Sequence, residues 1–325
     1  MKQFIKKSIQ IIVPILLGIC VFIIVYRNMD FKQIFQIIKN GVKVEWIVFS
    51  FVFGILSNII RGHRWQMMLQ AIKQNPSLKN TTFAVFGLYF MNALIPRLGE
   101  FSRCQVLSQY EKIPFSESFG TVVSERIWDM LSMGLIFLCG FAIQYDFYAQ
   151  FFANQLQLSS LFNKVFSFGW WPVITLLLLI VCVGVLMKKS HLHQRFRAIC
   201  ENFISGVLSI RNLRHKTLFI IESALIWGCY FMQLYVCQFA FDFTADLTLL
   251  NAFTLYIMGS LGVLVPVPQG IGTWHFMVIS TLVLFGVTST NAAAFALLVH
   301  ATQTLLLIIL GFISFIMLPL TNKKR

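Results

Sequence analysis

Residues Thr81 to Arg103 read TTFAVFGLYFMNALIPRLGEFSR and combine an apolar run with a break in the helix. Its first eleven residues, through Met91, carry no charge, and a proline, a glycine, a glutamate and two arginines then occur within eight residues. In lipid, every main-chain N–H and C=O group needs a partner, and Pro96 and Gly99 interrupt the helix that would supply them. Such a break is tolerated only where it is buried in protein or lines a wet cavity. The ionisable residues around this break therefore indicate a functional site inside a membrane protein.

A second interruption lies in the other half of the chain, where residues 265–273 read VPVPQGIGT. Pro266 and Pro268 rule out a regular helix, whereas Gly270 and Gly272 permit positive φ angles or a close approach of the backbone. Two interrupted hydrophobic segments, one in each half of a chain, are the pattern that points to the binding site of a transporter.

The composition is that of a membrane protein. Of the 325 residues, 58% are hydrophobic and 12% are charged, whereas soluble domains carry about 25% charged residues. The 76 residues from Leu247 to Asn322 contain no Asp, Glu, Lys or Arg. These features predict a polytopic helical membrane protein. We expect a single integral membrane domain over residues 1–325, without a soluble catalytic domain.

The charge and the cysteines exclude two other classes of function. The net charge is +14, but the basic residues stand at the ends of apolar runs. They are therefore expected to set membrane topology and to contact anionic lipids, and no nucleic-acid partner is expected. The seven cysteines have no CxxC spacing, so we expect no metal site, no disulfide and no cofactor.

The apolar runs predict an all-α transmembrane bundle of about six full spans and two broken or re-entrant helical hairpins, with an inverted pseudo-repeat. The runs abutting the two breaks are too short for a full span, which takes about 20 residues. The nine runs are Ile9–Tyr26, Trp46–Ile60, Thr81–Ile95, Ser118–Gln144, Trp171–Met187, Thr217–Phe241, Leu249–Val265, Trp274–Val287 and Ala292–Leu318.

The distribution of basic residues predicts the orientation. Segment 188–216 is strongly basic, and together with both termini it is expected in the cytoplasm. Segments 145–170 and 242–248 are poor in basic residues and are expected outside. Segment 27–45 is basic but must also lie outside as a loop between two spans. With these assignments the two hairpins enter from opposite faces of the membrane. Two thin full spans in place of the second hairpin would leave the chain on the same side and so agree equally well.

A cluster of charges stands near the start of the fourth run. Glu125 and Asp129 have i,i+4 spacing and share one helix face, while Arg126 points about 100° away from them. We expect Arg97 or Arg103 to pair with one of these carboxylates, because an unpaired charge in lipid costs several kcal/mol. The alternative is a solvated helix end at the cytoplasmic surface.

Two further groups of residues suggest contacts with an anion. Arg61 and Arg64 have i,i+3 spacing and could clamp a phosphate, a task that suits the planar guanidinium; the alternative is interfacial snorkelling, with Trp65 at the membrane surface. His275 stands in the first turn after the second break, where free backbone amides could also bind an anion. The alternative for His275 is a hydrogen-bonded structural role. The sequence contains no GxSxG, HExxH or P-loop motif.

In their order and spacing these motifs resemble the lysylphosphatidylglycerol synthase transmembrane-region family, also described as flippase-like or YbhN-like membrane proteins. The resemblance covers nearly the whole chain. It is carried by Arg61 with Arg64 and Trp65, then by the pattern Asn92-x-x-x-Pro96-x-x-Gly99-Glu100-x-x-Arg103, and finally by Glu125-Arg126-x-x-Asp129 and the Pro268-x-Gly270-Ile271-Gly272 turn. A glutamate commonly follows that turn in the family, whereas this chain has His275.

The resemblance implies a multi-pass protein of the bacterial inner membrane. Some relatives join this region to an aminoacyl-transferase domain that makes lysyl-phosphatidylglycerol, and their membrane part moves the lipid. This chain ends at Arg325 without such a domain, so we do not expect a synthase.

Three hypotheses follow. The first is a translocator of an anionic phospholipid or lipid-linked headgroup, with membrane lipids as partners and the oligomeric state left open. The second is a membrane enzyme or assembly subunit acting on lipid-linked substrates, and the third is a scaffold. For the first, the residues expected to contact the headgroup, or to hold those contacts, are Arg61, Arg64, Asn92, Arg97, Glu100, Arg103, Glu125, Arg126, Asp129 and His275. Pro96, Gly99, Pro266, Pro268, Gly270 and Gly272 would shape the breaks.

Overall fold

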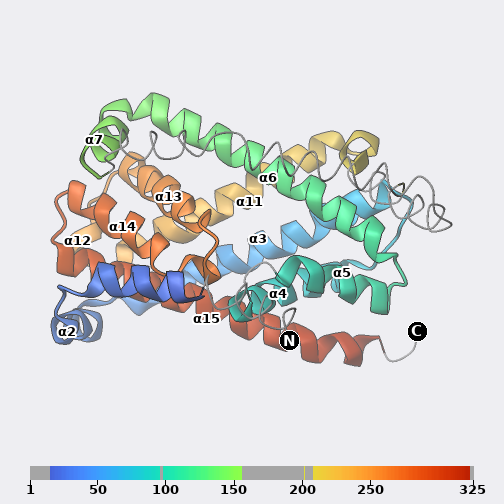
Figure 1. Ribbon diagram of the computed structural model, residues 1–325, viewed down its shortest axis with the longest axis horizontal. Coiled ribbons are helices and arrows are strands. Elements are labelled where there is room, and N and C mark those ends of the chain that lie inside the picture. The colour runs from blue at the N-terminus through green and yellow to red at the C-terminus, as the bar shows by residue number, and fades with distance from the viewer. Residues whose placement is uncertain (1–14, 96–97, 156–200, 202–207, 323–325) are drawn as a thin grey trace, which may run out of the picture.

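The computed structural model describes residues 15–95, 98–155, 201 and 208–322, and within them it contains helices and no β-strand (Figure 1). This confirms the predicted all-α polytopic membrane fold. The helices are Ile15–Tyr26, α2 (Phe31–Gly41), α3 (Val44–Gln70), α4 (Leu78–Leu94), α5 (Leu98–Tyr110), α6 (Phe115–Ile143), α7 (Tyr145–Gln155), η1 (Leu208–Asn212), α11 (Lys216–Cys237), η2 (Gln238–Ala240), α12 (Asp242–Ala245), α13 (Leu249–Val263), η3 (Pro268–Gly270), α14 (Thr273–Leu284) and α15 (Ser289–Thr321).

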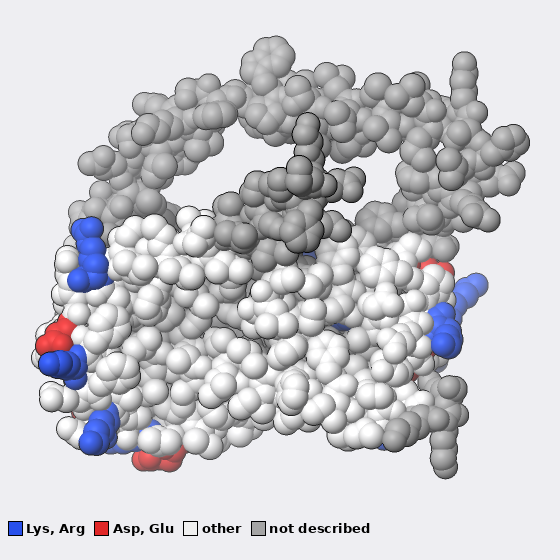
Figure 2. Space-filling view, turned by 60° about the horizontal axis from the view of Figure 1, so that its bottom comes forward, with Lys and Arg blue, Asp and Glu red and all other residues white. Residues whose placement is uncertain are grey.

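Four of these helices are long and apolar enough to cross a membrane: α3, α6, α11 with η2, and α15. They account for four of the six predicted spans. The first predicted span is described only from Ile15, and the run Trp171–Met187 lies outside the described residues. Figure 2 shows charged side chains gathered toward the two ends of the long axis, with a broad uncharged belt between them. This belt is the surface expected to face hydrocarbon.

Both predicted breaks are helical hairpins. In the first, α4 has 17 residues and α5 returns beside it; in the second, α13 has 15 residues and α14 returns beside it. At 1.5 Å per residue, α4 is about 26 Å long and α13 about 22 Å, both less than the hydrocarbon thickness of about 30 Å. The two hairpins enter from opposite ends of the molecule and their tips meet near its middle (Figure 1).

Close helix contacts form the two tips. In the first, a Cβ added at Gly99 would lie 2.1 Å from the main-chain oxygen of Leu88, so only glycine permits α5 to pack this tightly on α4. The main-chain N–H of Gly99 also donates to Oδ1 of Asn92 over 2.7 Å. In the second, Gly270 and Gly272 have φ angles of 73° and 84°, which other residues adopt only with strain. Pro96 and Arg97 lie outside the described residues.

The segment 27–45, expected as a loop between spans, contains the strongly amphipathic helix α2. Asp30 caps it by accepting hydrogen bonds from the N–H groups of Lys32 and Gln33. Ile34 is buried against the bundle, whereas Phe35 and Lys39 are exposed. Its 11 residues are too few for a span, and its polar face interrupts the apolar pattern, so the segment does not stand out as a long apolar run.

Candidate functional site

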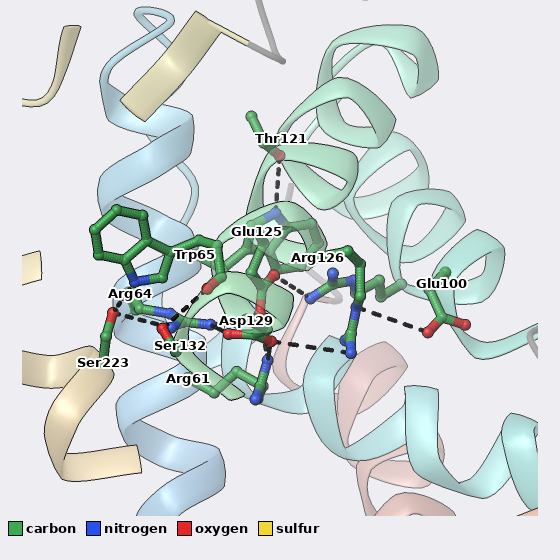
Figure 3. A network of polar contacts seen from close by, with 12 residues as sticks. Arg61, Arg64, Trp65, Glu100, Thr121, Glu125, Arg126, Asp129, Ser132 and Ser223 are labelled. Carbon is green, nitrogen blue, oxygen red and sulfur yellow. Dashed lines mark hydrogen bonds and ion pairs between the residues drawn. The ribbon is translucent and has the colours of Figure 1, made fainter. Parts of the chain in front are cut away.

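The centre of the molecule holds a buried network of ion pairs between α3 and α6 (Figure 3). Nη1 of Arg61 donates to Oε1 of Glu125 over 2.6 Å and to Oδ2 of Asp129 over 2.7 Å. Nη2 of Arg64 donates to Oδ1 of Asp129 over 2.7 Å and to Oε1 of Glu125 over 3.2 Å. Each carboxylate therefore receives hydrogen bonds from two arginines.

Helical spacing explains this arrangement. Glu125 and Asp129 are one turn apart on α6, and Arg61 and Arg64 are one turn apart on α3, so two matching pairs meet where the helices pack. For this to occur, α3 has to continue past the apolar run that ends at Ile60, and it does so as far as Gln70. Ten residues of α6 precede Glu125, which places it about 15 Å along the helix. The network therefore lies more than two turns inside α6, a helix that is long and apolar enough to cross a membrane.

Two more arginines complete the network. From α5, Nη1 of Arg103 lies 2.8 Å from Oε2 of Glu125. Arg126 of α6 has its Nε 3.8 Å from Oε1 of Glu100 and its Nη1 4.0 Å from Oδ2 of Asp129. The described network thus contains four arginines and three carboxylates, so it carries one excess positive charge.

Aromatic and hydroxyl groups hold the inner arginines in place. The guanidinium carbon of Arg103 lies 4.7 Å from the centre of the Trp65 ring, and that of Arg64 lies 5.6 Å from the Phe219 ring. The indole N–H of Trp65 donates to the hydroxyl of Thr121 over 2.9 Å. Because the side chains of Arg64, Arg103 and Glu125 are fully buried, removing one partner would leave an uncompensated charge in a medium that solvates it poorly.

A cavity of about 500 Å³ lies beside this network. Its charged lining residues are Arg61, Arg126 and Asp129, so two positive charges are balanced by one negative charge. The rest of the lining is aromatic, apolar, or bears an amide or a hydroxyl, and it comes from seven helices and the second break: Gly54, Asn58, Tyr89, Met130, Met133, Trp227, Tyr230, Gln233, Leu234, Tyr256, Ser260, Val263, Leu264, Gln269, Trp274, His300, Gln303, Thr304 and Leu307. Such a lining suits a ligand that has both an anionic group and an apolar part.

The structure brings seven of the ten expected contact residues into the network: Arg61, Arg64, Glu100, Arg103, Glu125, Arg126 and Asp129. They divide into two layers. Arg61, Arg126 and Asp129 line the cavity, whereas Arg64, Arg103 and Glu125 are buried behind them. The expected pairing of Arg103 with a carboxylate is present, while Arg97 is not among the described residues. Arg61 and Arg64, expected to clamp phosphate, are partners of Glu125 and Asp129.

Two expected residues have mainly structural contacts. Asn92 accepts the hydrogen bond from Gly99 that closes the first tip. His275 is buried, and its Nδ1 accepts a hydrogen bond from the N–H of Gly272 over 3.4 Å, which caps α14. Its ring also packs edge-on against Phe22 and Tyr26 of the first helix.

Several cavity residues carry no signal in the sequence. Gln269, within the second break, donates from Nε2 to the main-chain oxygen of Tyr89 over 2.9 Å. Its own main-chain oxygen lies 2.9 Å from Nε2 of His300. The hydroxyls of Tyr89 and Tyr230 are 3.2 Å apart. A polar residue such as Gln269 inside a proline- and glycine-rich break is the one feature that could have drawn attention beforehand.

Comparisons with known proteins agree with this architecture. The family model described as the lysylphosphatidylglycerol synthase TM region matches residues 11–311. The UPF0104 membrane protein MJ1595 of Methanocaldococcus jannaschii is 25% identical, over 98% of this chain and 97% of its own length. The UPF0104 membrane protein MJ1078 of the same organism is 24% identical, over 70% of this chain and 93% of its own length. No solved structure matches the chain.

Proposed function

The chain belongs to the family of the lysylphosphatidylglycerol synthase transmembrane region, and from this premise we propose that it moves an anionic, phosphate-bearing lipid or lipid-linked headgroup across the membrane. The headgroup would occupy the central cavity between the two inverted hairpins. The hydrocarbon part of the lipid would stay in the bilayer. Inverted broken hairpins that meet at mid-depth are the architecture expected of a site with alternating access.

One observation carries this proposal: Arg61 and Arg126 face the same cavity in the membrane interior, and Asp129 is the acid beside them. A charge at this depth is costly and is retained where it has a task. The Nε atoms of Arg61 and Arg126 are buried and have no hydrogen-bond acceptor among the described residues, so the described contacts do not use every donor of either guanidinium. A guanidinium binds phosphate through paired, parallel N–H groups.

The network behind the cavity would hold these arginines in position. Glu125 and Asp129 fix Arg61, and Glu100 lies beside Arg126. Asp129 is the acid that touches both cavity arginines. In this scheme a phosphate that binds Arg61 and Arg126 competes with Asp129, and the freed carboxylate would either change partner or take up a proton during the transport cycle.

The test is translocation of fluorescent lipids in proteoliposomes, with a phosphatidylglycerol probe beside a zwitterionic phosphatidylcholine probe. Arg126→Gln is the informative variant, because its side chain lines the cavity and is 39% exposed. Its loss leaves Asp129 paired with Arg61 and Arg64 and removes an ion pair only from Glu100, which is 21% exposed. A charge-assisted hydrogen bond is worth about 1.5–3 kcal/mol, so transport of the anionic probe should fall by about 10- to 100-fold. Lys79→Gln, at an exposed lysine of α4, is the matched control and should transport normally.

The same assay separates the other two hypotheses. Turnover of the lipid by purified protein would favour a membrane enzyme. Normal transport by well-folded Arg126→Gln would show that the cavity arginines are not needed to bind the headgroup. A scaffold without transport activity would give the same signal as empty liposomes with either probe, and its network variants would lose only folded protein.

A further inference from the structure

Three residues of the cavity lining are apolar and strongly exposed, and we call the edge that they form the mouth of the cavity. Among the lining residues, Met130 is 70% exposed, Leu264 is 61% exposed and Val263 is 53% exposed. Met130 lies about half-way along α6, while Val263 and Leu264 end α13 at the tip of the second hairpin. An opening bordered by such side chains at the middle of a membrane bundle would face hydrocarbon and not water.

The surface of α6 continues this opening. Gly134 is one helical turn beyond Met130 and is exposed, and no atom of the described residues lies within 4 Å of the position that a Cβ would occupy. On the other side, Arg126 is one turn before Met130. Four residues of helix correspond to about 6 Å, so the cationic group, the apolar rim and the open surface follow one another along a single helix face.

We propose that the seam between α6 and the tip of α13 is the portal through which the hydrocarbon chain of a bound lipid leaves the cavity. This inference rests on the proposed function and makes it more specific. The ligand is a phosphate joined to a long chain: the phosphate lies at Arg126, and the first part of the chain passes between Met130 and Leu264. The chain then follows the surface of α6 past Gly134 into the bilayer.

The order of the groups supports this assignment. In a phospholipid or an isoprenoid phosphate, the apolar chain begins a few bonds from the phosphate, which matches the separation of about 6 Å between Arg126 and Met130 along the helix. Arg126 is more exposed than the inner arginines Arg64 and Arg103, as a residue near the mouth should be. The charged part of the cavity and its apolar rim would thus bind the two halves of one amphipathic molecule.

The first test maps the path of the chain by photolabelling the full-length protein in lipid nanodiscs. Three probes carry a diazirine in the chain: phosphatidylglycerol, polyprenyl phosphate, and a diacylglycerol that lacks the phosphate. Labelling at Met130, Val263 and Leu264 is divided by labelling at Leu138 and Leu249, which are similarly exposed on the same two helices. We expect this ratio to be several-fold higher for a phosphate-bearing probe than for diacylglycerol, and to fall in Arg126→Gln.

The comparison of the two phosphate-bearing probes distinguishes an acyl from an isoprenoid chain. An equal ratio for all three probes would overturn the portal, because the rim would then be ordinary lipid-facing surface. This readout does not need transport, so it still decides the portal if the translocation assay shows no activity.

The second test closes the seam. The test uses a double variant, Met130→Cys with Leu264→Cys, whose other cysteines are replaced. This protein is treated with a bifunctional maleimide that contains a cleavable disulfide. We expect the doubly substituted protein to lose transport on cross-linking and to regain it after reduction, so that each sample serves as its own control. Undiminished transport by the cross-linked protein would overturn the portal and leave the proposed function intact. Because Leu138→Trp adds bulk to α6 away from the rim, it should transport normally, whereas Met130→Trp should not.

Discussion

The side-chain amide of Gln269 donates a hydrogen bond to the main-chain oxygen of Tyr89 over 2.9 Å, and so joins the tips of two hairpins that enter from opposite ends. The same residue holds α15 through the contact between its main-chain oxygen and Nε2 of His300. Its φ angle is 50°, a left-handed conformation that costs free energy for a residue other than glycine. Strain of this kind, at a residue that lines the cavity, is typical of a position that changes during function.

We therefore predict that Gln269→Ala impairs transport more than it impairs folding. One neutral hydrogen bond contributes about 1 kcal/mol, so the midpoint of thermal unfolding in detergent should fall by only a few degrees. Transport should fall several-fold, because the two tips lose the contact that fixes their relative position. Gln109→Ala, at an exposed residue of α5, is the control. Equal transport by Gln269→Ala and wild type would show that the contact only stabilises the bundle.

The second prediction concerns two glutamates of the network. Glu125 is fully buried and contacts Arg61, Arg64 and Arg103, whereas Glu100 is 21% exposed and lies 3.8 Å from Arg126. Breaking a buried ion pair by removing one partner costs about 3–5 kcal/mol. Glu125→Gln should therefore yield little folded protein in fluorescence-detected size-exclusion chromatography. Glu100→Gln should give a normal monodisperse peak. A low yield from both variants would contradict the prediction that only the fully buried glutamate is needed for folding.

Arg103 shows why the site could be predicted only in part. The sequence places Arg103 next to a helix break and favours a carboxylate partner, which it has. A sequence does not tell how deep the residue lies, because depth depends on how α5 packs on α4 and α6. Its complete burial against Trp65 and Glu125 makes it a residue that holds the network, so Arg103→Gln should reduce folding as well as transport. Arg126 differs from Arg103 in that its side chain is exposed at the cavity.

The fold was more accessible to prediction than the site. Apolar runs and proline–glycine breaks act locally, so they predicted the long helices and both hairpins. The two partners of Glu125 on α3 come from 64 and 61 residues earlier in the chain, and no local pattern specifies which arginine meets which carboxylate. The cavity residues Tyr89 and Tyr230 are aromatic residues in apolar helices like many others, and only their tertiary position makes them part of the lining.

The third prediction tests the close packing of the first hairpin. A Cβ at Gly99 would lie 2.1 Å from the main-chain oxygen of Leu88 and 2.8 Å from the side chain of Asn92, so Gly99→Ala has to separate α5 from α4. Overpacking of this kind costs about 1–3 kcal/mol or more, and the thermal midpoint should fall clearly. Gly228→Ala on α11 is the matched control, because its added Cβ has no atom within 4 Å in the described part of the chain. A loss of stability in Gly228→Ala equal to that in Gly99→Ala would reject close packing as the cause.

The last prediction concerns orientation. At the end of the bundle where α3 ends and α11 begins, the described residues include the basic side chains Lys73, Lys79, Lys112, Arg211, Arg214 and Lys216, together with the acids Glu111 and Glu117. At the opposite end, Arg27, Lys32, Lys39 and Lys43 are accompanied by Asp30, Glu45, Asp146, Asp242 and Asp246, and Lys43 pairs with Asp242 over 2.7 Å. Cytoplasmic segments carry the excess of Lys and Arg, so we propose that the first end, where α15 also finishes, is cytoplasmic.

Single cysteines at exposed positions test this orientation: Lys112→Cys at the proposed cytoplasmic end and Lys39→Cys on α2 at the other end. The background must lack Cys20 and Cys139, which are exposed. A membrane-impermeant maleimide should label Lys39→Cys in intact cells and Lys112→Cys only after permeabilisation. The reverse pattern would invert the protein in the membrane, so that the α4–α5 hairpin enters from outside and the α13–α14 hairpin from the cytoplasm. Because both hairpin tips meet at the same cavity, the headgroup site would stay at mid-depth and only the direction of access would change.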